Sequence, residues 1–459
     1  MVDYAETYHA MKVLDGNLKW FGYSVMQAME KAGRGIADHV TKRFGRQNKI
    51  AIFVGPGNKG GDGLVAAWYL APQNTVRVFL VAEPKTKESQ ANLEHIQKSK
   101  KIKIRHAKTQ KGLPRRTAFD VYVDALVGLG LNGELRQPVR RVVTWLNQQK
   151  GKKVAVDVPT GHGSDTSFKA DVVLSMHTPK VSGAVVVDVG IPKKLEGFVG
   201  PGQVNALALN RGQHKGQNGV ITVIGGSAQY HGAPLYAVQA AKAFCDLIYF
   251  YSPSKKLAFL DRMKTKSNAF STVKKSQLDA AIQKSDCVLI GPGLEENASN
   301  KKLVNNLLKK FPTKKFVLDA GAMMLAEKKK FGGRVCLTPH AGEFKRCFGL
   351  TASASNAKAM AIKHQCVVLL KGKFDVITDG WKIFENFTGN PSMTRGGTGD
   401  VLAGLVTALS SQNDLFLSAQ AAAFLNGLSG DLVAKRHRMF SADDVAQTLP
   451  EAYEKALGC

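Results

Sequence analysis

Short apolar runs alternate with helical patterns along the first part of this 459-residue chain. The runs are of strand length and lie at residues 50–54, 76–81, 102–104, 121–123, 154–158 and 172–174. Helical periodicity appears between some of them, at residues 63–70 and 140–148. Strands that alternate with helices predict a parallel, doubly wound sheet whose ligands bind outside the carboxyl ends of the strands.

A second α/β series begins with the apolar run at residues 220–224. Its later strand patterns end in polar or glycine-rich turns near residues 291–294, 318–322, 338–343 and 370–372. The stretch between the two series, residues 189–210, holds Pro192, Pro201 and four glycines, which predicts a tether. We therefore expect two α/β domains, residues 1–205 and residues 206–459.

The segment 389–400, Gly-Asn-Pro-Ser-Met-Thr-Arg-Gly-Gly-Thr-Gly-Asp, runs directly into an apolar helical pattern. Glycines such as Gly397 and Gly399 let bare backbone N–H groups approach an anion, and the helix dipole adds positive potential there. Asp400 stands where it can take a proton from a hydroxyl that attacks a bound phosphoryl group. An ordinary glycine-rich turn is the alternative interpretation. We favour the phosphoryl site, because four of five consecutive residues here are of the specific types that such a site requires.

The first strand pattern ends in Gly55-x-Gly57-x-x-Gly60, the spacing of a dinucleotide-binding loop, and Glu83 follows at the distance of a ribose-binding acid. The Asp62 carboxylate lies inside the same loop, at the place where a bound pyrophosphate would need N–H donors, and this argues against a dinucleotide site. A lone match of this kind is weak support for a hydride-transferring dehydrogenase.

Two further acids, Asp124 and Asp157, end later strand patterns of the same series. They can cap the helices that follow. With Thr160 and the Asn58 loop they can equally supply oxygen ligands to a cation. Spacing alone leaves both interpretations open.

Two motifs of the second series can each be interpreted as a ligand contact or as part of a turn. Lys371 and Gly372 follow a strand pattern, where they can hold a nucleotide phosphate or simply form a turn. His340, between Pro339 and Ala341, can contact a ligand or serve as a turn residue.

Composition narrows the class of protein. The chain has no apolar run of membrane-helix length and no apolar leader after Asp3 and Glu6, so we expect a cytoplasmic protein that does not associate with membranes. The six cysteines form no C-x-x-C pair, and Cys287, Cys336 and Cys366 lie in strand-like runs typical of reduced core residues. The net charge of +28 attracts polyanions, but the lysines are scattered, which argues against a nucleic-acid-binding protein.

Taken together, these motifs resemble the bifunctional NAD(P)H-hydrate repair enzymes, in which an epimerase domain is fused to a dehydratase domain. The resemblance extends over nearly the whole chain, from residues 55–64, 123–131, 156–161 and 188–192 to residues 291–294, 318–322, 338–343 and 389–404. It implies a Rossmann-like three-layer α/β/α domain followed by a ribokinase-like α/β domain. It also implies a homo-oligomer that acts on hydrated NADH and NADPH (NADHX and NADPHX).

For the first domain, the resemblance implies interconversion of the R and S hydrates, with Asp157 as the acid/base. Potassium would be held by Asn58, Asp124 and Thr160. The residues implied to surround the substrate, besides Asp157, are Gly128, Leu129, Gly130, Leu131, Asn132, Gly133 and Glu134.

For the second domain, the resemblance implies dehydration of the S hydrate at the expense of ADP or ATP with Mg²⁺. The ring hydroxyl is phosphorylated, and phosphate, a better leaving group than hydroxide, then departs. The residues implied to contact the hydrate are Ala233, Gly293, His340 and Asp400. Those implied to contact the nucleotide are Lys371, Gly372, Lys373, Phe374, Asp375, Gly397 and Gly399.

The chain departs from the family pattern at a few positions. Lys59 stands where the family has a second asparagine, so its ammonium would compete with potassium or replace it. Lys31 likewise replaces an asparagine, and Arg395 replaces a smaller residue beside the anion loop. A small-molecule kinase remains the nearest alternative function, and an RNA-binding scaffold is a second.

Overall fold

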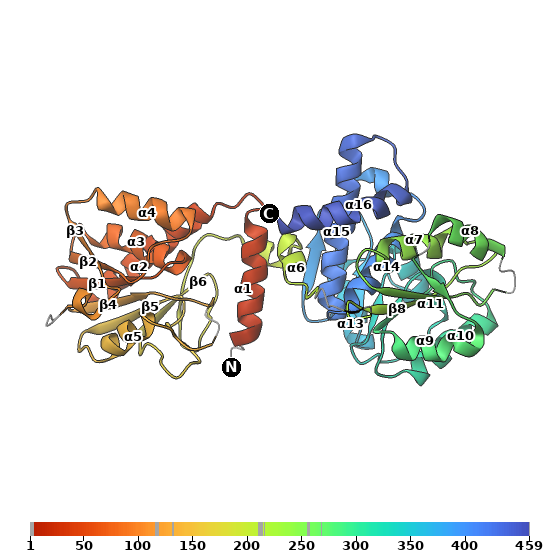
Figure 1. The fold of residues 1–459 in the computed structure, drawn as a ribbon, viewed down its shortest axis with the longest axis horizontal. Helices are drawn as coiled ribbons and strands as arrows, with labels where there is room; N and C mark the ends of the chain where they lie inside the picture. Colours follow the sequence, from red (N-terminus) through yellow and green to blue (C-terminus); the bar gives the residue numbers. More distant parts are fainter. Residues whose placement is uncertain are drawn as a thin grey trace. The chain divides into compact units, whose positions relative to one another are not determined.

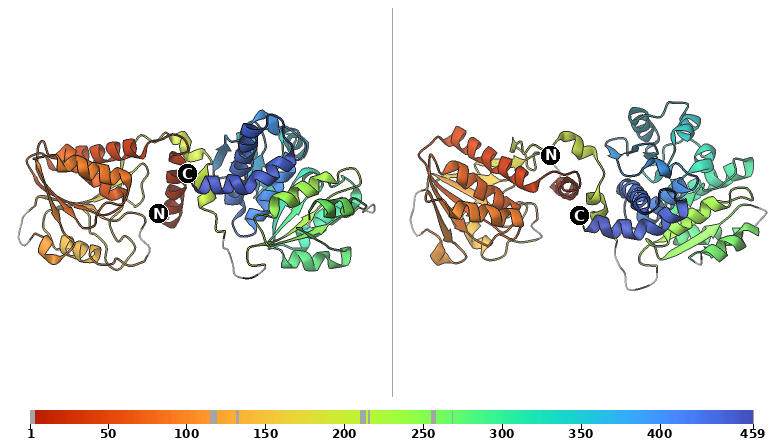
Figure 2. Two further views of the ribbon diagram at one scale, coloured as in Figure 1. Left: turned by 45° about the horizontal axis from the view of Figure 1, so that its top comes forward. Right: turned by 90° about the horizontal axis from the view of Figure 1, so that it is seen from above.

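The computed structural model describes residues 4–114, 119–130, 133–209, 214, 216–254, 258–267 and 269–458. The chain divides into two compact units, each a sheet with helices packed on it (Figures 1 and 2). The first unit comprises Met1–Lys12 and Phe21–Lys193, and the second comprises Val13–Trp20 and Lys194–Cys459. Among the described residues, no helix has the length and apolarity required to cross a membrane.

The first unit is a seven-stranded, wholly parallel sheet in the order β3-β2-β1-β4-β5-β6-β7. Its strands are β1 (Lys49–Val54), β2 (Thr75–Leu80), β3 (Ile102–His106), β4 (Val121–Ala125), β5 (Lys152–Val156), β6 (Val172–Met176) and β7 (Val185–Val187). Its helices are the first part of α1 (Tyr4–Leu18), α2 (Val25–Phe44), α3 (Asn58–Leu70), α4 (Lys87–Gln97) and α5 (Val139–Asn147), with the short 3-10 turn η1 (Gln110–Gly112). This is the parallel α/β sheet that the apolar runs predict.

The central strand β1 explains why the runs are continuous rather than alternating. Every residue of it after Lys49 is buried, because helices cover both faces of the sheet. Phe53 stacks on Phe79 of β2 at 4.8 Å between ring centroids, on the face that α5 covers. On the opposite face, a Cβ at Gly63 of α3 would come within 3.4 Å of Ile52.

The glycine-rich segment after β1 differs from the expected loop, because α3 begins at Asn58, inside that segment. Its glycines allow close packing rather than an open turn. A Cβ at Gly60 would lie 2.2 Å from the Gly55 carbonyl oxygen, and one at Gly61 would lie 2.4 Å from the sulfur of Met29. The glycine spacing that matches a dinucleotide-binding loop therefore serves close packing within the protein.

The second unit is built on a nine-stranded sheet in the order β10-β9-β8-β11-β12-β13-β14-β15-β16. Its strands are β8 (Val220–Ile224), β9 (Leu247–Tyr251), β10 (Ser271–Thr272), β11 (Cys287–Ile290), β12 (Lys315–Leu318), β13 (Val335–Leu337), β14 (Val367–Leu370), β15 (Asp375–Thr378) and β16 (Ile383–Asn386). The strands are parallel except for the antiparallel pairs β14–β15 and β15–β16.

Helices cover both faces of this second sheet. They are α6 (Pro201–Asn205), α7 (Gly232–Ala241), α8 (Ala258–Lys266), α9 (Leu278–Lys284), α10 (Ala298–Lys310), α11 (Ala320–Leu325), α12 (Ala341–Phe348), α13 (Ala354–His364), α14 (Thr398–Ser410), α15 (Leu415–Arg436) and α16 (Ala442–Leu457). Three short 3-10 turns complete the unit: η2 (Lys193–Gly197), η3 (Lys275–Gln277) and η4 (Pro391–Met393). In β11, Cys287 and Leu289 face the core beneath α14 and α15, whereas Val288 and Ile290 face the core beneath α10 and α11.

The cysteines of the second sheet behave as core residues. Cys287, Cys336 and Cys366 are buried and unbonded, as their strand-like settings predict. Burial raises the pKa of the Cys287 thiol to about 12, so it stays protonated and unreactive at neutral pH.

The stretch predicted as a tether is instead largely part of the second unit. Residues 199–204, which include most of α6, are buried. Asn17 of α1 donates to the side-chain oxygen of Gln203 at 3.0 Å and accepts from the Gly202 N–H at 2.7 Å. Because of such contacts, the two units divide between Lys193 and Lys194, whereas the sequence predicts the boundary between residues 205 and 206. The same contacts assign Val13–Trp20 to the second unit.

Candidate active sites in the two units

The glycine motif of the second unit lies at the start of α14. Gly397 caps this helix with φ of 100°, a left-handed conformation that favours glycine, and a Cβ there would meet the Tyr236 ring at 2.5 Å. The N–H groups of the first helical turn have no partner inside a helix, and they include those of Gly399 and Asp400. Gly396, just before the helix, is exposed, and nothing lies within 4 Å of a Cβ built on it.

Three strand ends bring a charged cluster to this helix start. Lys371, after β14, donates to the Asp319 carboxylate at 3.0 Å, and its Nζ lies 3.9 Å from Glu343. Asp319 follows β12 and also accepts from Thr338 at 2.7 Å. A Cβ at Gly399 would lie 3.2 Å from the Lys371 Nζ, which places the ammonium directly beside the α14 turn.

The cluster shifts the protonation of Asp400. Burial, and then the charge of Asp319, raise the pKa of Asp400 to about 7, while Lys371 opposes the shift. For Lys371 itself, burial lowers the pKa, but the carboxylates of Asp319 and Glu343 outweigh it and the net shift is upward. The site therefore holds a fixed ammonium and a carboxyl group that changes protonation near neutral pH, a combination typical of acid–base sites.

The loops after β8 and β11 border the same helix start. Gly293 has φ of 69°, and a Cβ there would lie 2.1 Å from the Tyr230 carbonyl oxygen, so it packs against the turn that leads to Ala233. Tyr236, one turn further along α7, touches Gly397, and burial together with nearby Asp443 and Asp400 raises the pKa of its hydroxyl. Ala233 thus lies in the first turn of α7, the helix that contacts Gly397 through Tyr236, and Gly293 packs on the turn before that helix.

His340 has a clear local role. Its Nδ1 accepts the N–H groups of Gly342 at 3.0 Å and Glu343 at 3.3 Å, while Glu343 accepts the His340 N–H, which forms a capping box at α12. The ring is largely exposed, and its Nε2 lies 3.6 Å from Glu343. His340 therefore caps a helix at the edge of the charged cluster, a position that also leaves its ring open to a ligand.

The predicted nucleotide contacts in the turn between β14 and β15 differ in whether they bond within the protein or are exposed. Asp375 accepts the Gly372 N–H at 3.1 Å and the Asn386 side chain at 3.1 Å, so both of its oxygens stabilise the hairpin. Phe374 is exposed, and the Lys373 ammonium lies 5.3 Å from the centre of its ring. Lys373 and Phe374 are thus exposed and Lys371 is paired with Asp319, whereas Asp375 shapes the turn.

The acid of the first unit, Asp157, follows β5 in a left-handed conformation with φ of 65°. The Ser175 hydroxyl donates to the Asp157 carbonyl oxygen at 2.8 Å, and the Asp157 N–H donates to the Leu174 carbonyl oxygen. These two hydrogen bonds hold Asp157 in its uncommon backbone conformation. The Lys180 ammonium is buried and pairs with Asp157 Oδ1. Oδ2 lies 3.5 Å from a Cβ built on Gly128, so the second oxygen faces the glycine loop after β4.

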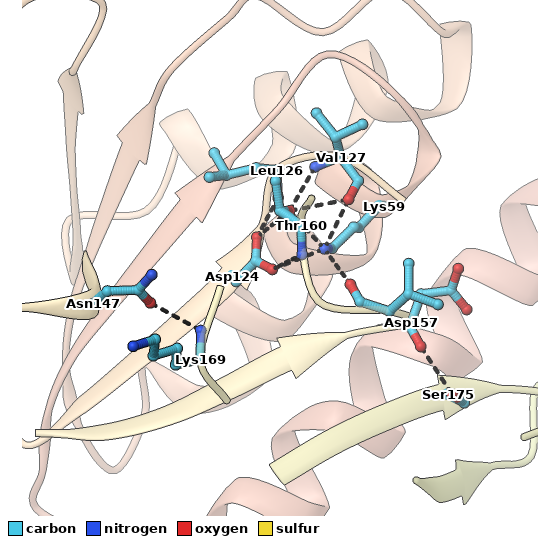
Figure 3. A network of polar contacts seen from close by, with 10 residues as sticks. Lys59, Asp124, Leu126, Val127, Asn147, Asp157, Thr160, Lys169 and Ser175 are labelled. Atoms are coloured by element: carbon cyan, nitrogen blue, oxygen red, sulfur yellow. Dashed lines mark hydrogen bonds and ion pairs between the residues drawn. The ribbon is translucent and has the colours of Figure 1, made fainter. Parts of the chain in front are cut away.

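Beside Asp157 lies a closed cage of oxygen atoms around the Lys59 ammonium (Figure 3). The Lys59 Nζ lies 3.0 Å from Asp124, 3.0 Å from the Thr160 hydroxyl, 3.1 Å from the Val127 carbonyl and 2.8 Å from the Val158 carbonyl. The side chains of Lys59 and Asp124 are 5% and 0% exposed. Burial lowers the pKa of Lys59, and the Asp124 carboxylate acts against that shift.

Both halves of the chain match known protein families. Residues 25–182 match the family described as YjeF-related protein N-terminus, and residues 221–451 match NAD(P)H-hydrate dehydratase. The bifunctional NAD(P)H-hydrate repair enzyme of Archaeoglobus fulgidus is 39% identical over 96% of this chain and 97% of its own length. That of Pyrobaculum aerophilum is 34% identical over 97% of each chain.

The chain belongs to the bifunctional NAD(P)H-hydrate repair enzymes.

Solved structures related to this repair enzyme support the fold of its second unit. The ADP/ATP-dependent NAD(P)H-hydrate dehydratase of Bacillus subtilis, co-crystallised with ATP/Mg²⁺, has a TM-score of 0.51 and 26% identity over 56% of this chain and 98% of its own. A ribokinase-like superfamily protein from Enterococcus faecalis has a TM-score of 0.53 and 23% identity over 56% of this chain and 95% of its own. The predicted ribokinase-like and Rossmann-like α/β folds are confirmed.

The sequence-predicted residues of the repair enzyme's first site fall into separate groups. Gly128 lies beside Asp157, whereas Glu134 lies further along the loop, where it accepts the Asp165 N–H at 3.3 Å. Leu131 and Asn132, between them, lie outside the described residues. Asn58 begins α3 next to Lys59. Of the four oxygens around the Lys59 ammonium, two come from Asp124 and Thr160 and two from the backbone carbonyls of Val127 and Val158. Of the predicted metal ligands, Asp124 and Thr160 thus meet at the cage, whereas Asn58 supplies none of its four oxygens.

Three charged residues of the two sites were not assigned by the sequence. Asp319 and Glu343 lie in strand-end motifs, and that position is the signal that marks them. Lys180 follows β6 in an unremarkable turn, and only the folded chain brings it to Asp157. Each is the ionic partner of a residue that the sequence did single out.

Proposed function

We propose that this chain repairs hydrated NADH and NADPH, with epimerisation of the R and S hydrates in the first unit and nucleotide-dependent dehydration of the S hydrate in the second. The observation that carries the proposal is Asp400 at the open start of α14, beside the Lys371–Asp319 pair. Family membership supplies the reaction, and this geometry supplies a base and an anion site for it. We assign the epimerase to the unit around Asp157 and the dehydratase to the unit around Asp400.

In dehydration, the Asp400 carboxylate accepts the proton of the ring hydroxyl as the hydroxyl oxygen attacks the terminal phosphorus of the nucleotide. The N–H groups of Gly397 and Gly399 and the Lys371 ammonium hold the phosphoryl charge during the transfer. The carbon–oxygen bond then breaks, phosphate leaves with the electron pair, and the neighbouring ring carbon loses a proton. The ring double bond is thereby restored.

The nucleotide and its metal fit this arrangement. Among the described residues, no group of three or more His, Cys, Asp or Glu side chains is arranged to hold a metal ion by itself. Mg²⁺ commonly binds through substrate phosphates together with one or two carboxylates. We therefore propose that the nucleotide phosphates would carry the Mg²⁺ ion and that Asp319, Glu343 and Asp400 would lie next to it. We propose either ADP or ATP as the nucleotide, next to two exposed residues, Gly396 and Phe374.

In epimerisation, Asp157 accepts the proton of the ring hydroxyl as the bond between the hydroxyl-bearing carbon and the ring nitrogen breaks, which gives an aldehyde. The nitrogen then adds to the other face of the aldehyde carbon, and Asp157 returns the proton to the oxygen. Lys180 holds Oδ1 of Asp157, which leaves Oδ2 directed toward Gly128 and the substrate-binding loop. The buried ammonium thus fixes the orientation of the carboxylate.

The pH dependence of dehydration follows from the pKa of Asp400. The base is the carboxylate, so turnover rises with pH through about 7, where the carboxyl group of the folded protein ionises. Asp319→Asn removes a negative charge that raises this pKa and moves the rise to lower pH. Lys371→Met removes an opposing positive charge and moves the rise to higher pH. The checking measurement is the pH profile of S-hydrate turnover for the three proteins; equal midpoints would contradict the electrostatic coupling.

Stoichiometry tests the reaction itself. With S-hydrate and ADP, we expect reduced nicotinamide, AMP and inorganic phosphate to form in equal amounts, measured by absorbance, chromatography and a phosphate assay. A small-molecule kinase would instead leave the phosphate on a stable product. Phosphorylated hydrate that accumulates without recovery of reduced nicotinamide would replace the repair function with the kinase.

A further inference from the structure

We propose that the Lys59 ammonium is a built-in monovalent cation that occupies the place of a bound potassium ion, so that the first unit of this chain works without one. The resemblance to the family implies potassium near Asp124 and Thr160, and the question is whether the residues present leave room for it. They do not, because the Nζ of Lys59 lies at the centre of the oxygens that would coordinate the ion (Figure 3).

The contacts of Lys59 are those of a coordinated cation. Its Nζ is surrounded by four oxygens at 2.8–3.1 Å: one carboxylate, one hydroxyl and two backbone carbonyls. An ammonium group and K⁺ are similar in size, carry the same charge and prefer such oxygen ligands. A second cation inserted among the same four oxygens would lie next to the ammonium and be repelled by it.

The cage is fully satisfied with the ammonium in place. Asp124 Oδ1 accepts from the Thr160 hydroxyl at 2.6 Å and the Leu126 N–H at 3.1 Å, and Oδ2 accepts from Lys59 and the Thr160 N–H. The Asp124 carboxylate is entirely buried, and Lys59 is the cation paired with it. A neutral amine would leave that buried charge uncompensated, which is costly, so the pair is ionic.

The position of Lys59 in its helix also supports a role as the cation of the cage. It is the second residue of α3, where the helix dipole disfavours a positive charge. Helix formation therefore does not explain a lysine here. Its long side chain instead carries the charge away from the helix start and into the cage, where Asp124 compensates it.

The ammonium connects the parts of the epimerase site. The Val127 carbonyl begins the loop that contains Gly128, and the Val158 carbonyl follows Asp157 directly. One cation thus ties α3 to the substrate-binding loop and to the turn that carries the acid/base. Lys59 is accordingly a positioning residue for the proposed epimerisation, and this part of the inference rests on that proposed function.

The test uses the full chain, its Lys59→Asn variant and the control Lys103→Asn, which makes the same exchange at an exposed strand residue. Binding of Tl⁺, a probe for K⁺ sites, is measured by ²⁰⁵Tl NMR with K⁺ as competitor. Thermal unfolding is compared in KCl and in tetramethylammonium chloride at equal ionic strength. We expect no K⁺-displaceable Tl⁺ and no K⁺-specific stabilisation for the unaltered chain and the control, but both effects for Lys59→Asn.

Kinetics provide a second readout. Consumption of R-hydrate by the unaltered chain is expected to be the same in both salts, whereas Lys59→Asn is expected to need K⁺ in a saturable manner. K⁺-displaceable Tl⁺ binding to the unaltered chain would overturn the inference, as would an absence of binding to a folded Lys59→Asn protein. A chain without epimerase activity would refute the proposed function, while the Tl⁺ and unfolding results would still decide the occupant of the cage.

Discussion

The Asp400→Asn variant loses dehydration of the S hydrate, with a turnover number about 10²–10⁴-fold below that of the unaltered chain, the range ascribed to a positioned general base. The amide has the shape of the carboxylate but cannot accept the hydroxyl proton. Because the N–H groups of the α14 turn and the Lys371 ammonium remain, nucleotide affinity should change little. Single-turnover absorbance of reduced nicotinamide and equilibrium titration with nucleotide measure the two quantities.

A matched control for this exchange is Asp261→Asn, because the Asp261 side chain is 86% exposed on α8. It should retain the turnover of the unaltered chain. Substantial turnover in a folded Asp400→Asn protein would remove Asp400 from the role of base. A loss of nucleotide affinity equal to the loss of turnover would show that Asp400 acts in binding instead.

The Asp157→Asn variant loses epimerisation to a similar extent, about 10²–10⁴-fold, because the amide cannot exchange the proton that a carboxylate carries. Consumption of R-hydrate by the full chain should fall toward the spontaneous rate. Consumption of S-hydrate should be unchanged, since Asp400 and its partners belong to the other unit. The same protein sample thus supplies its own control for the dehydratase.

Loss of the Asp157 charge also leaves the Lys180 ammonium buried without its partner, which destabilises the fold. The double variant Asp157→Asn with Lys180→Met should recover stability but not activity, as thermal unfolding and the R-hydrate assay would report. Asp38→Asn, an exchange on the exposed side of α2, is the neutral comparison. Normal epimerisation by the double variant would mean that the acid/base is another residue.

Much of the fold could be predicted because parallel, doubly covered strands must be apolar along their whole length. The run at residues 50–54 forms all but the first residue of β1, and residues 121–123 lie within β4. The β7 strand escaped prediction because Val185 and Val186 are exposed at the sheet edge and the strand is short. The start of α3 was placed too late because its glycines, which read as a loop, serve close packing.

Asp400 and Asp157 could be singled out from the sequence, because each stands beside its own recognisable turn. Their ionic partners could not, because Lys371 meets Asp319, and Lys180 meets Asp157, only when separate strand ends converge. Lys59 shows the same limit. Its departure from the family pattern was visible, but its place at the centre of four oxygens depends on three segments of the folded chain.

The most direct test of the two-step repair is the recovery of reduced-nicotinamide absorbance from a mixture of R and S hydrates with Mg²⁺ and ADP or ATP. The unaltered chain should restore all of the absorbance. Asp157→Asn should slow to the spontaneous rate once the S hydrate is consumed, and Asp400→Asn should restore almost none on the same time scale. Failure of the unaltered chain to restore absorbance with either nucleotide would contradict the assignment.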